Sequence, residues 1–156
     1  MKVKNFNPFE SLSIISQHLK LLRDNDIIRS KNLVGDLGEF YACRILRFER
    51  TKNLIEHGYD AIDSGQLKVQ VKTRLNPQNV NKIIFSSFSF DYCVFVEIDE
   101  LFIPKFIRKI DKNLLRTILD TRGDRLSVSK FRKNSDIVWT HDGNVNSLQN
   151  LLFKIT

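Results

Sequence analysis

Residues 58–74 are GYDAIDSGQLKVQVKTR, and this stretch decides the fold of the chain. In residues 67–74, apolar or β-branched side chains alternate with lysine, glutamine and arginine. A period of two is typical of a strand with one face on a core and the other face turned outward. The pair Ser64-Gly65 is a turn signal, so residues 59–62 and 67–74 are predicted to form a hairpin.

This hairpin carries polar groups that suit phosphodiester chemistry. Asp60 enters it, and Gln70 and Lys72 lie on the outward row of its second strand, where the three can meet across the ladder. Asp60 and Gln70 offer oxygens to a divalent cation, and Lys72 offers a fixed positive charge. Such a cation neutralises phosphate charge and activates water, while the lysine holds the nucleophile or the developing charge. The pattern favours hydrolysis of a phosphodiester.

The order of these residues resembles the PD-(D/E)XK nuclease superfamily, which has the restriction-endonuclease-like fold. Asp60 matches the first acid of that motif, Gln70 stands where the second acid usually stands, and Lys72 matches the lysine. Glu39 matches the glutamate that the preceding helix often supplies. Tyr59 replaces the proline of the motif. Gln70 keeps an oxygen for a metal but brings no charge, so the site has two carboxylates at most.

The resemblance covers residues 33–98 and implies both a fold and an activity. The implied fold class is α/β, with a restriction-endonuclease-like mixed β-sheet of four to five strands flanked by helices. The implied activity is a metal-dependent endonuclease that hydrolyses nucleic acid, with DNA as the expected substrate. The implied catalytic residues are Glu39, Asp60, Gln70 and Lys72. Mg²⁺ or Mn²⁺ would be held by Glu39, Asp60, the side-chain oxygen of Gln70 and the carbonyl of Val71, because hard oxygen ligands favour magnesium over zinc.

The chain of 156 residues has the length of one domain, so residues 1–156 are predicted to form a single unit. Its core is expected over residues 33–108. Apolar residues at three- and four-residue spacing predict a helix over 9–23 that covers one face of the sheet. A second helix over 33–48 is apolar around most of its circumference and is therefore expected to be largely buried. The C-terminal part, 111–156, is expected to be mainly helical.

Three further strands are predicted. Residues 91–98 are almost continuously apolar, which indicates a central strand covered on both faces. Residues 101–107 form another strand, in which Pro104 indicates an edge or a bulge. Residues 53–57 are expected to form a short strand that ends at His57, a candidate phosphate contact.

The net charge of +7 and the pI of about 9.5 favour a polyanion as partner, because phosphate contacts release counterions. Candidate nucleic-acid contacts follow the lysine strand or form the densest basic cluster of the chain; they are Arg74, Asn76, Arg122, Arg125, Lys130 and Arg132. A solvated basic face is the alternative for this cluster.

The longest apolar runs are too short to span a bilayer, and the first residues lack an apolar leader segment, so a cytoplasmic protein without a membrane partner is expected. Cys43 and Cys93 have neither zinc-ligand spacing nor a disulfide framework. Two alternatives to an enzyme stay open: a module that binds nucleic acid without cutting it, and a protein-interaction scaffold. A homodimer is expected only by analogy, for double-strand cleavage.

Overall fold

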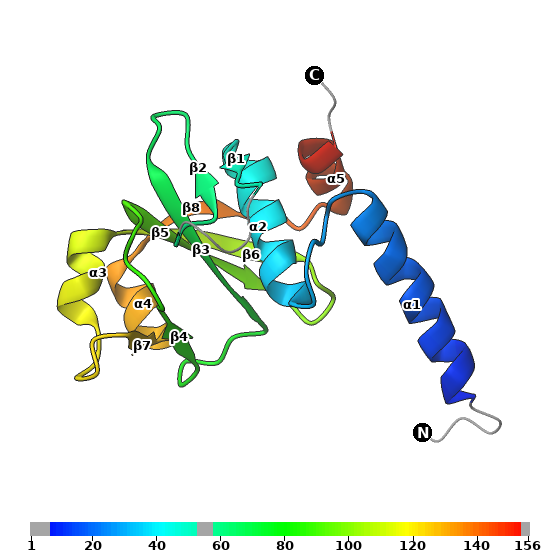
Figure 1. The fold of residues 1–156 in the computed structure, drawn as a ribbon, viewed down its shortest axis with the longest axis horizontal. Helices are drawn as coiled ribbons and strands as arrows, with labels where there is room; N and C mark the ends of the chain where they lie inside the picture. Colours follow the sequence, from blue (N-terminus) through cyan, green and yellow to red (C-terminus); the bar gives the residue numbers. More distant parts are fainter. Residues whose placement is uncertain (1–6, 53–57, 154–156) are drawn as a thin grey trace.

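The computed structural model of this chain describes residues 7–52 and 58–153, which form an α/β fold (Figure 1). The strand predicted over 53–57, with His57, lies outside the described residues. The described helices are α1 (Pro8–Asp24), α2 (Leu33–Leu46), α3 (Lys112–Ile118), α4 (Val128–Asn134) and α5 (Val145–Phe153). The described strands are β1 (Glu49–Arg50), β2 (Ala61–Ile62), β3 (Lys68–Leu75), β4 (Lys82–Ile84), β5 (Tyr92–Ile98), β6 (Pro104–Asp111), β7 (Arg125–Ser127) and β8 (Asp136–Thr140).

The strands of the described residues form a mixed sheet of six and a second sheet of two. The order of the large sheet is β1-β2-β3-β5-β6-β8, and β4 pairs with β7 in the small one. β3 and β5 run parallel, whereas the other neighbours are antiparallel. The predicted α/β class and the flanking helices are confirmed. The sheet is wider than the expected four to five strands because β1, of only two residues, was not predicted and β8 lies in the part predicted to be mainly helical.

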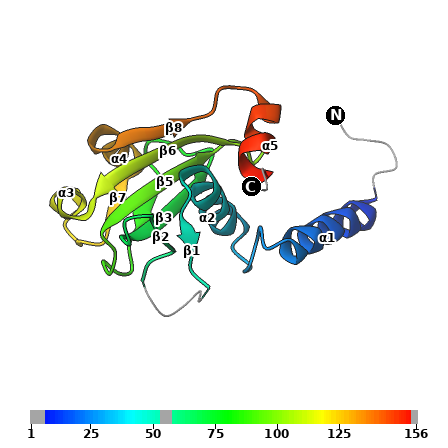
Figure 2. The same cartoon turned by 90° about the horizontal axis from the view of Figure 1, so that it is seen from above.

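The large sheet separates two apolar clusters. On one face, Val94 and Val96 of β5 pack with α2 and α5. On the other face, Cys93 and Phe95 pack with α3, α4 and the small sheet, and the rings of Phe95 and Phe131 lie 5.2 Å apart. Figures 1 and 2 show these two layers on either side of the sheet. Every residue of β5 is buried, which confirms the predicted central strand.

The N-terminal helix does not cover the sheet, so that part of the prediction is wrong. α1 begins after Asn7, whose side chain accepts a hydrogen bond from Phe9 N at 3.1 Å. Every residue of α1 is described and none is buried. Only Leu19 and Leu22 pack in part against the core, and Figure 2 shows the helix projecting from the rest of the fold. The apolar spacing indicates that one face of the helix is apolar, but it does not identify the surface against which that face packs.

The lysine strand is also less exposed than predicted. Val69, Val71 and Thr73 of β3 are buried as expected. Lys68 is exposed, but Gln70, Lys72 and Arg74 of the same row are half-buried rather than open to solvent, because α4 and the small sheet cover that face. Of the two readings of Pro104, the edge strand is wrong, since β6 lies between β5 and β8. The irregularity is confirmed, since Pro104 pairs with Ile98 at a register shift between β5 and β6.

Candidate functional site

A cavity of about 280 Å³ lies between the start of α2 and the strand β3. The four side chains that the sequence predicts as catalytic line this one cavity, together with the predicted metal-binding Val71. The lining residues are Asn32, Val34, Gly35, Glu39, Asp60, Gln70, Val71, Lys72, Thr73, Arg74 and Ile84. A larger cavity of about 530 Å³ lies at the other end of α2, and none of the predicted catalytic residues lines it. The smaller cavity is therefore the candidate site.

Asp60 is the residue just before β2, and it lines the cavity. Its backbone N–H donates to Val69 O at 2.8 Å, which fixes it beside β3. Its Oδ2 accepts hydrogen bonds from Val71 N at 2.7 Å and from the Gln70 amide. Burial, and then the charge of Glu39, raises the pKa of Asp60 to about 6, although the Val71 bond and Lys72 oppose that shift. The hydrogen bond from Val71 and the charge of Lys72 thus do not fully offset the effects of burial and of Glu39 on Asp60.

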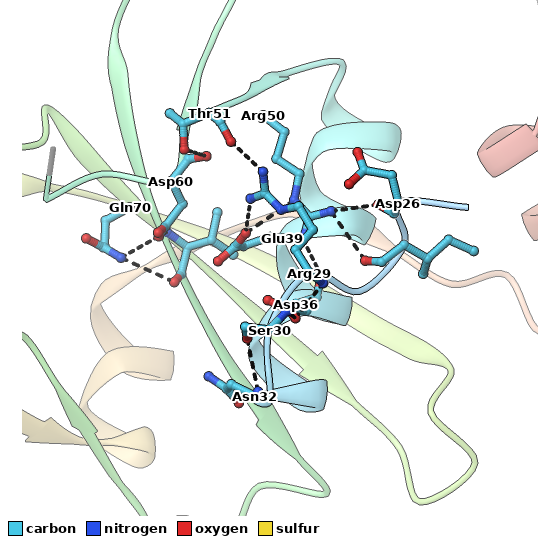
Figure 3. A network of polar contacts seen from close by, with 12 residues as sticks. Asp26, Arg29, Ser30, Asn32, Asp36, Glu39, Arg50, Thr51, Asp60 and Gln70 are labelled. Atoms are coloured by element: carbon cyan, nitrogen blue, oxygen red, sulfur yellow. Dashed lines mark hydrogen bonds and ion pairs between the residues drawn. The ribbon is translucent and has the colours of Figure 1, made fainter. Parts of the chain in front are cut away.

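Gln70 bridges two oxygens of the site. Its Nε2 donates to Asp60 Oδ2 and makes a longer contact of 3.5 Å with Val71 O (Figure 3). Both oxygens belong to the set that the sequence predicts for a cation. In this arrangement the amide NH₂ of Gln70 contacts the two predicted ligand oxygens. Its Oε1 is the atom that could act as a further ligand to a cation.

Glu39 is held by two arginines rather than by the lysine strand. Its Oε2 accepts from Arg29 Nη2 at 2.8 Å and lies 3.2 Å from Arg50 Nε (Figure 3). Arg29 also donates to Thr51 O, and Arg50 to backbone carbonyls that include Asp36 O. An arginine or lysine partner for Glu39 is the alternative to a metal, but the sequence does not identify Arg29 and Arg50, because they lie on a connector and on a two-residue strand rather than on the helix of Glu39.

Lys72 lies on the side of the cavity nearest the second apolar cluster. Its Nζ is 5.3 Å from the centre of the Phe85 ring, and its charge acts on Asp60 in the direction that favours the carboxylate. Phe85 thus packs against the lysine without neutralising it. The site therefore contains a half-buried ammonium group within electrostatic range of a carboxyl group.

The approach of α2 to β3 depends on a glycine. A Cβ atom at Gly38 would lie 1.7 Å from Thr73 Oγ1, which is far closer than packed atoms allow. The missing side chain lets the helix lie directly on the strand. Glu39 is the next residue, so this contact sets how near its carboxylate comes to Asp60.

Of the six predicted nucleic-acid contacts, three have guanidinium groups with partners in this chain and three are exposed. Arg125 is 2.8 Å from Asp124, and Arg132 is 2.6 Å from the buried Glu97, so both guanidinium groups already have carboxylate partners. Arg74 lines the cavity and donates to two backbone carbonyls. The remaining three candidates are exposed; they are Asn76, Arg122 and Lys130.

The basic cluster is connected to the cavity by the small sheet. Ile84 of β4 lines the cavity and pairs with Arg125 of β7. Backbone hydrogen bonds from Val128 and Ser129 to Asn81 O and Asn79 O attach the loop after β3 to the start of α4. A polyanion in the cavity would therefore be close to this loop.

Among residues 7–52 and 58–153, no three His, Cys, Asp or Glu side chains gather as a metal-binding group. The donor set at the cavity is two carboxylates, one amide oxygen and one backbone carbonyl. In the same part of the chain, no helix combines the length and hydropathy needed to cross a bilayer.

A scan of known protein families found no model that matches the chain, and a search of curated proteins found no significant match.

Proposed function

We propose that this protein is a metal-dependent nuclease of the PD-(D/E)XK type that hydrolyses phosphodiester bonds, with DNA as the expected substrate. The observation that carries the proposal is the meeting of Glu39, Asp60, Gln70 and Lys72 in one cavity, although up to thirty-three positions separate them. The raised pKa of Asp60 supports it, since perturbed carboxyl groups beside a cavity are typical of functional sites.

The residues at the cavity fit Mg²⁺ or Mn²⁺. Burial and the neighbouring Glu39 disfavour the charged form of Asp60, and a bound cation would relieve both effects. Asp60, Glu39, the Gln70 oxygen and Val71 O would hold the ion, all of them oxygen donors of the kind that magnesium prefers. When bound, the ion would supply charge neutralisation of the phosphate and activation of water.

The residues of the chain have separate roles in this proposal. Asp60 must be deprotonated, and the hydrogen bond from Val71 N orients it. Gln70 would turn its amide so that Oε1, rather than NH₂, faces Asp60. Lys72 would hold the attacking water and stabilise the charge that develops on the phosphate. Glu39 would contribute the carboxylate oxygen that the two arginines leave available, since both contact Oε2.

A second candidate is binding of nucleic acid without cleavage. The observation that favours it is the pairing of Glu39 with Arg29 and Arg50, so this carboxylate already has two cationic partners within the chain. Together with the amide at position 70, this leaves Asp60 as the main source of negative charge for a cation. The net charge of +7 supports nucleic acid as the ligand in both candidates.

The deciding experiment incubates supercoiled plasmid with the purified protein in Mg²⁺, in Mn²⁺ or in EDTA. Asp60→Asn tests the site, and Asp136→Asn removes one charge from an exposed position on β8 as the matched control. We expect nicking by the wild-type protein and Asp136→Asn only when metal is present, and none by Asp60→Asn.

The same samples separate the two candidates. DNA retention without metal-dependent nicking by any variant would favour the binding module. Equal nicking by wild type and Asp60→Asn would exclude the proposed site, and absence of both nicking and retention would exclude both candidates.

A further inference from the structure

We propose that α1 is the contact surface for a second copy of this chain, and that two α1 helices pair in antiparallel orientation. The proposal does not depend on the nuclease assignment. It rests on the exposure of α1, the spacing of its apolar side chains and the distribution of its charges.

The first residues of α1 are exposed, whereas its end is hydrogen-bonded to the rest of the fold. Ile27 N and Ile28 N donate to Leu22 O at 2.9 and 3.4 Å, and Ile28 is 2% exposed. Arg50 Nη1 donates to the carbonyls of Asp26 and Ile27. The helix therefore leaves the fold at a fixed place and extends away from it (Figures 1 and 2).

The free half of α1 exposes large apolar side chains. Phe9 is 79% exposed, Leu12 58% and Ile15 52%, and no residue of α1, all of which the structure describes, is buried. Adjacent exposed apolar residues on one element mark an interaction surface more often than isolated ones do. The unfavourable contact of these side chains with water is the driving force for a partner.

Four apolar residues of α1 have the spacing of a coiled-coil seam, whereas the exposed Ile14 and Leu21 lie elsewhere on the helix circumference. Leu12, Ile15, Leu19 and Leu22 are separated by three, four and three residues, which places all four within about 80° of the helix circumference. This stripe is symmetric about its centre. In an antiparallel pair, Leu12 of one copy lies opposite Leu22 of the other, and Ile15 opposite Leu19, which is an isologous contact.

The partial burial of Leu19 and Leu22 supports this orientation. Both pack in part against the core of their own copy. In the antiparallel pair, the exposed Leu12 and Ile15 of each copy reach the place where the α1 of the other copy meets its core. Each free half would therefore gain an apolar surface that is already formed.

The charges of α1 favour a second copy over a polyanion or an anionic membrane. The helix carries Glu10, Lys20, Arg23 and Asp24, whose formal charges cancel. Lys20 and Asp24 already pair at 2.6 Å and lie away from the stripe. In the antiparallel pair, Arg23 of one copy lies on the same flank as Phe9 of the other, where a cation–π contact can form.

The test is the mass of the protein in solution. Sedimentation of the wild-type chain up to about 100 µM should show a species of twice 18.3 kDa. Leu12→Asp combined with Ile15→Asp should weaken association by about 100-fold, because it places charges within the apolar stripe of each copy. Ser13→Asp combined with Gln17→Asp adds the same charge away from the stripe and should remain dimeric. Circular dichroism checks that both variants keep their helices.

Cross-linking tests the orientation. Leu12→Cys protein mixed with Leu22→Cys protein should form disulfides between the two variants, whereas each variant alone should form few. A wild-type chain that stays at 18.3 kDa would overturn the proposal, and so would a dimeric form of the Leu12→Asp, Ile15→Asp double variant. Disulfides formed mainly by each variant with itself would overturn the antiparallel pairing.

Discussion

Two glutamates on opposite faces of the sheet, Glu39 and Glu97, each bind two arginines, but only Glu39 lies beside a cavity with a second carboxyl group. Glu97, on β5, is 3.0 Å from Arg108 Nε and 2.6 Å from Arg132 Nη2. Arg132 also donates to Asn79 in the loop after β3. This cluster attaches α4 and the loop to the sheet, and its charges are matched by close contacts.

The Glu39 cluster differs because a second carboxyl group remains beside it. Arg29 and Arg50 bind Glu39, yet Asp60 keeps a raised pKa although Lys72 is within electrostatic range. A buried ion pair alone is weak evidence of function, since such pairs also occur in purely structural positions. A carboxyl group whose pKa stays raised beside a cavity is the stronger indication of function.

The first prediction tests whether chemistry belongs to the cavity that Glu39, Asp60 and Lys72 line together. Lys72→Ala should lower metal-dependent cleavage by about 100- to 1,000-fold, because it removes the charge that stabilises the developing anion. Plasmid nicking rates measure the loss. Lys68→Ala is the control, since this lysine of the same strand lies over Tyr59 and does not line the cavity. Cleavage by Lys72→Ala at the wild-type rate would remove the lysine from the mechanism.

The second prediction compares the two glutamates in stability. Glu97→Gln should lower the free energy of unfolding by about 3 kcal/mol, because it leaves the half-buried guanidinium group of Arg108 without its carboxylate. Glu39→Gln should cost about half as much, since Arg29 and Arg50 keep backbone carbonyl acceptors. Urea denaturation measures both. An equal or larger loss for Glu39→Gln would contradict the proposed difference between the clusters.

The third prediction concerns pH. The folded pKa of Asp60, about 6, lies above the ordinary value of 3.8, so the folded protein binds more protons than the unfolded chain between these pH values. Stability contributed by this group therefore falls as pH rises through that interval, by about 2 kcal/mol.

Urea denaturation at several pH values measures this slope. Asp60→Asn should remove the contribution, and Glu39→Gln should reduce it, because the charge of Glu39 is part of its cause. Affinity for Mg²⁺ should rise with pH over the same interval, as Asp60 loses its proton. An unchanged slope in Asp60→Asn would show that the carboxyl group titrates normally.

The fourth prediction separates basic residues that contact nucleic acid from those that hold the fold. Arg122→Ala and Lys130→Ala remove exposed charges, and each should reduce the slope of log affinity against log salt by about one. Arg132→Ala should instead lower stability, because it removes one partner of Glu97. Fluorescence anisotropy with a DNA duplex measures the slope. Loss of salt dependence in Arg132→Ala at unchanged stability would reverse the assignment.

Local spacing allowed the hairpin and its site to be predicted from the sequence. Asp60, Gln70 and Lys72 lie within thirteen residues of each other, so the strand period and a turn signal suffice to bring them together. The N-cap of α4 is equally local, because Ser127 accepts a hydrogen bond from Lys130 N at 3.2 Å, three residues along the chain.

Contacts between distant elements could not be predicted in this way. Arg50 reaches Glu39 from a strand of only two residues, which has no periodic signal. The apolar stripe of α1 predicted a covered face, but periodicity carries no information on whether the cover is the same chain or another. The half-burial of Lys72 depends on β4, β7 and α4, which follow it by ten to sixty residues.

The contact between Gly38 and Thr73 has a consequence for how this chain can change. A methyl group at position 38 would touch neither substrate nor ion, yet it would move α2 off β3 and carry the adjacent carboxylate with it. The spacing between Glu39 and Asp60 therefore depends on the absence of a Cβ atom at Gly38. Any alteration that lifts the helix, from a substitution there to a bulkier residue in place of Thr73, would displace the proposed catalytic groups without replacing any of them.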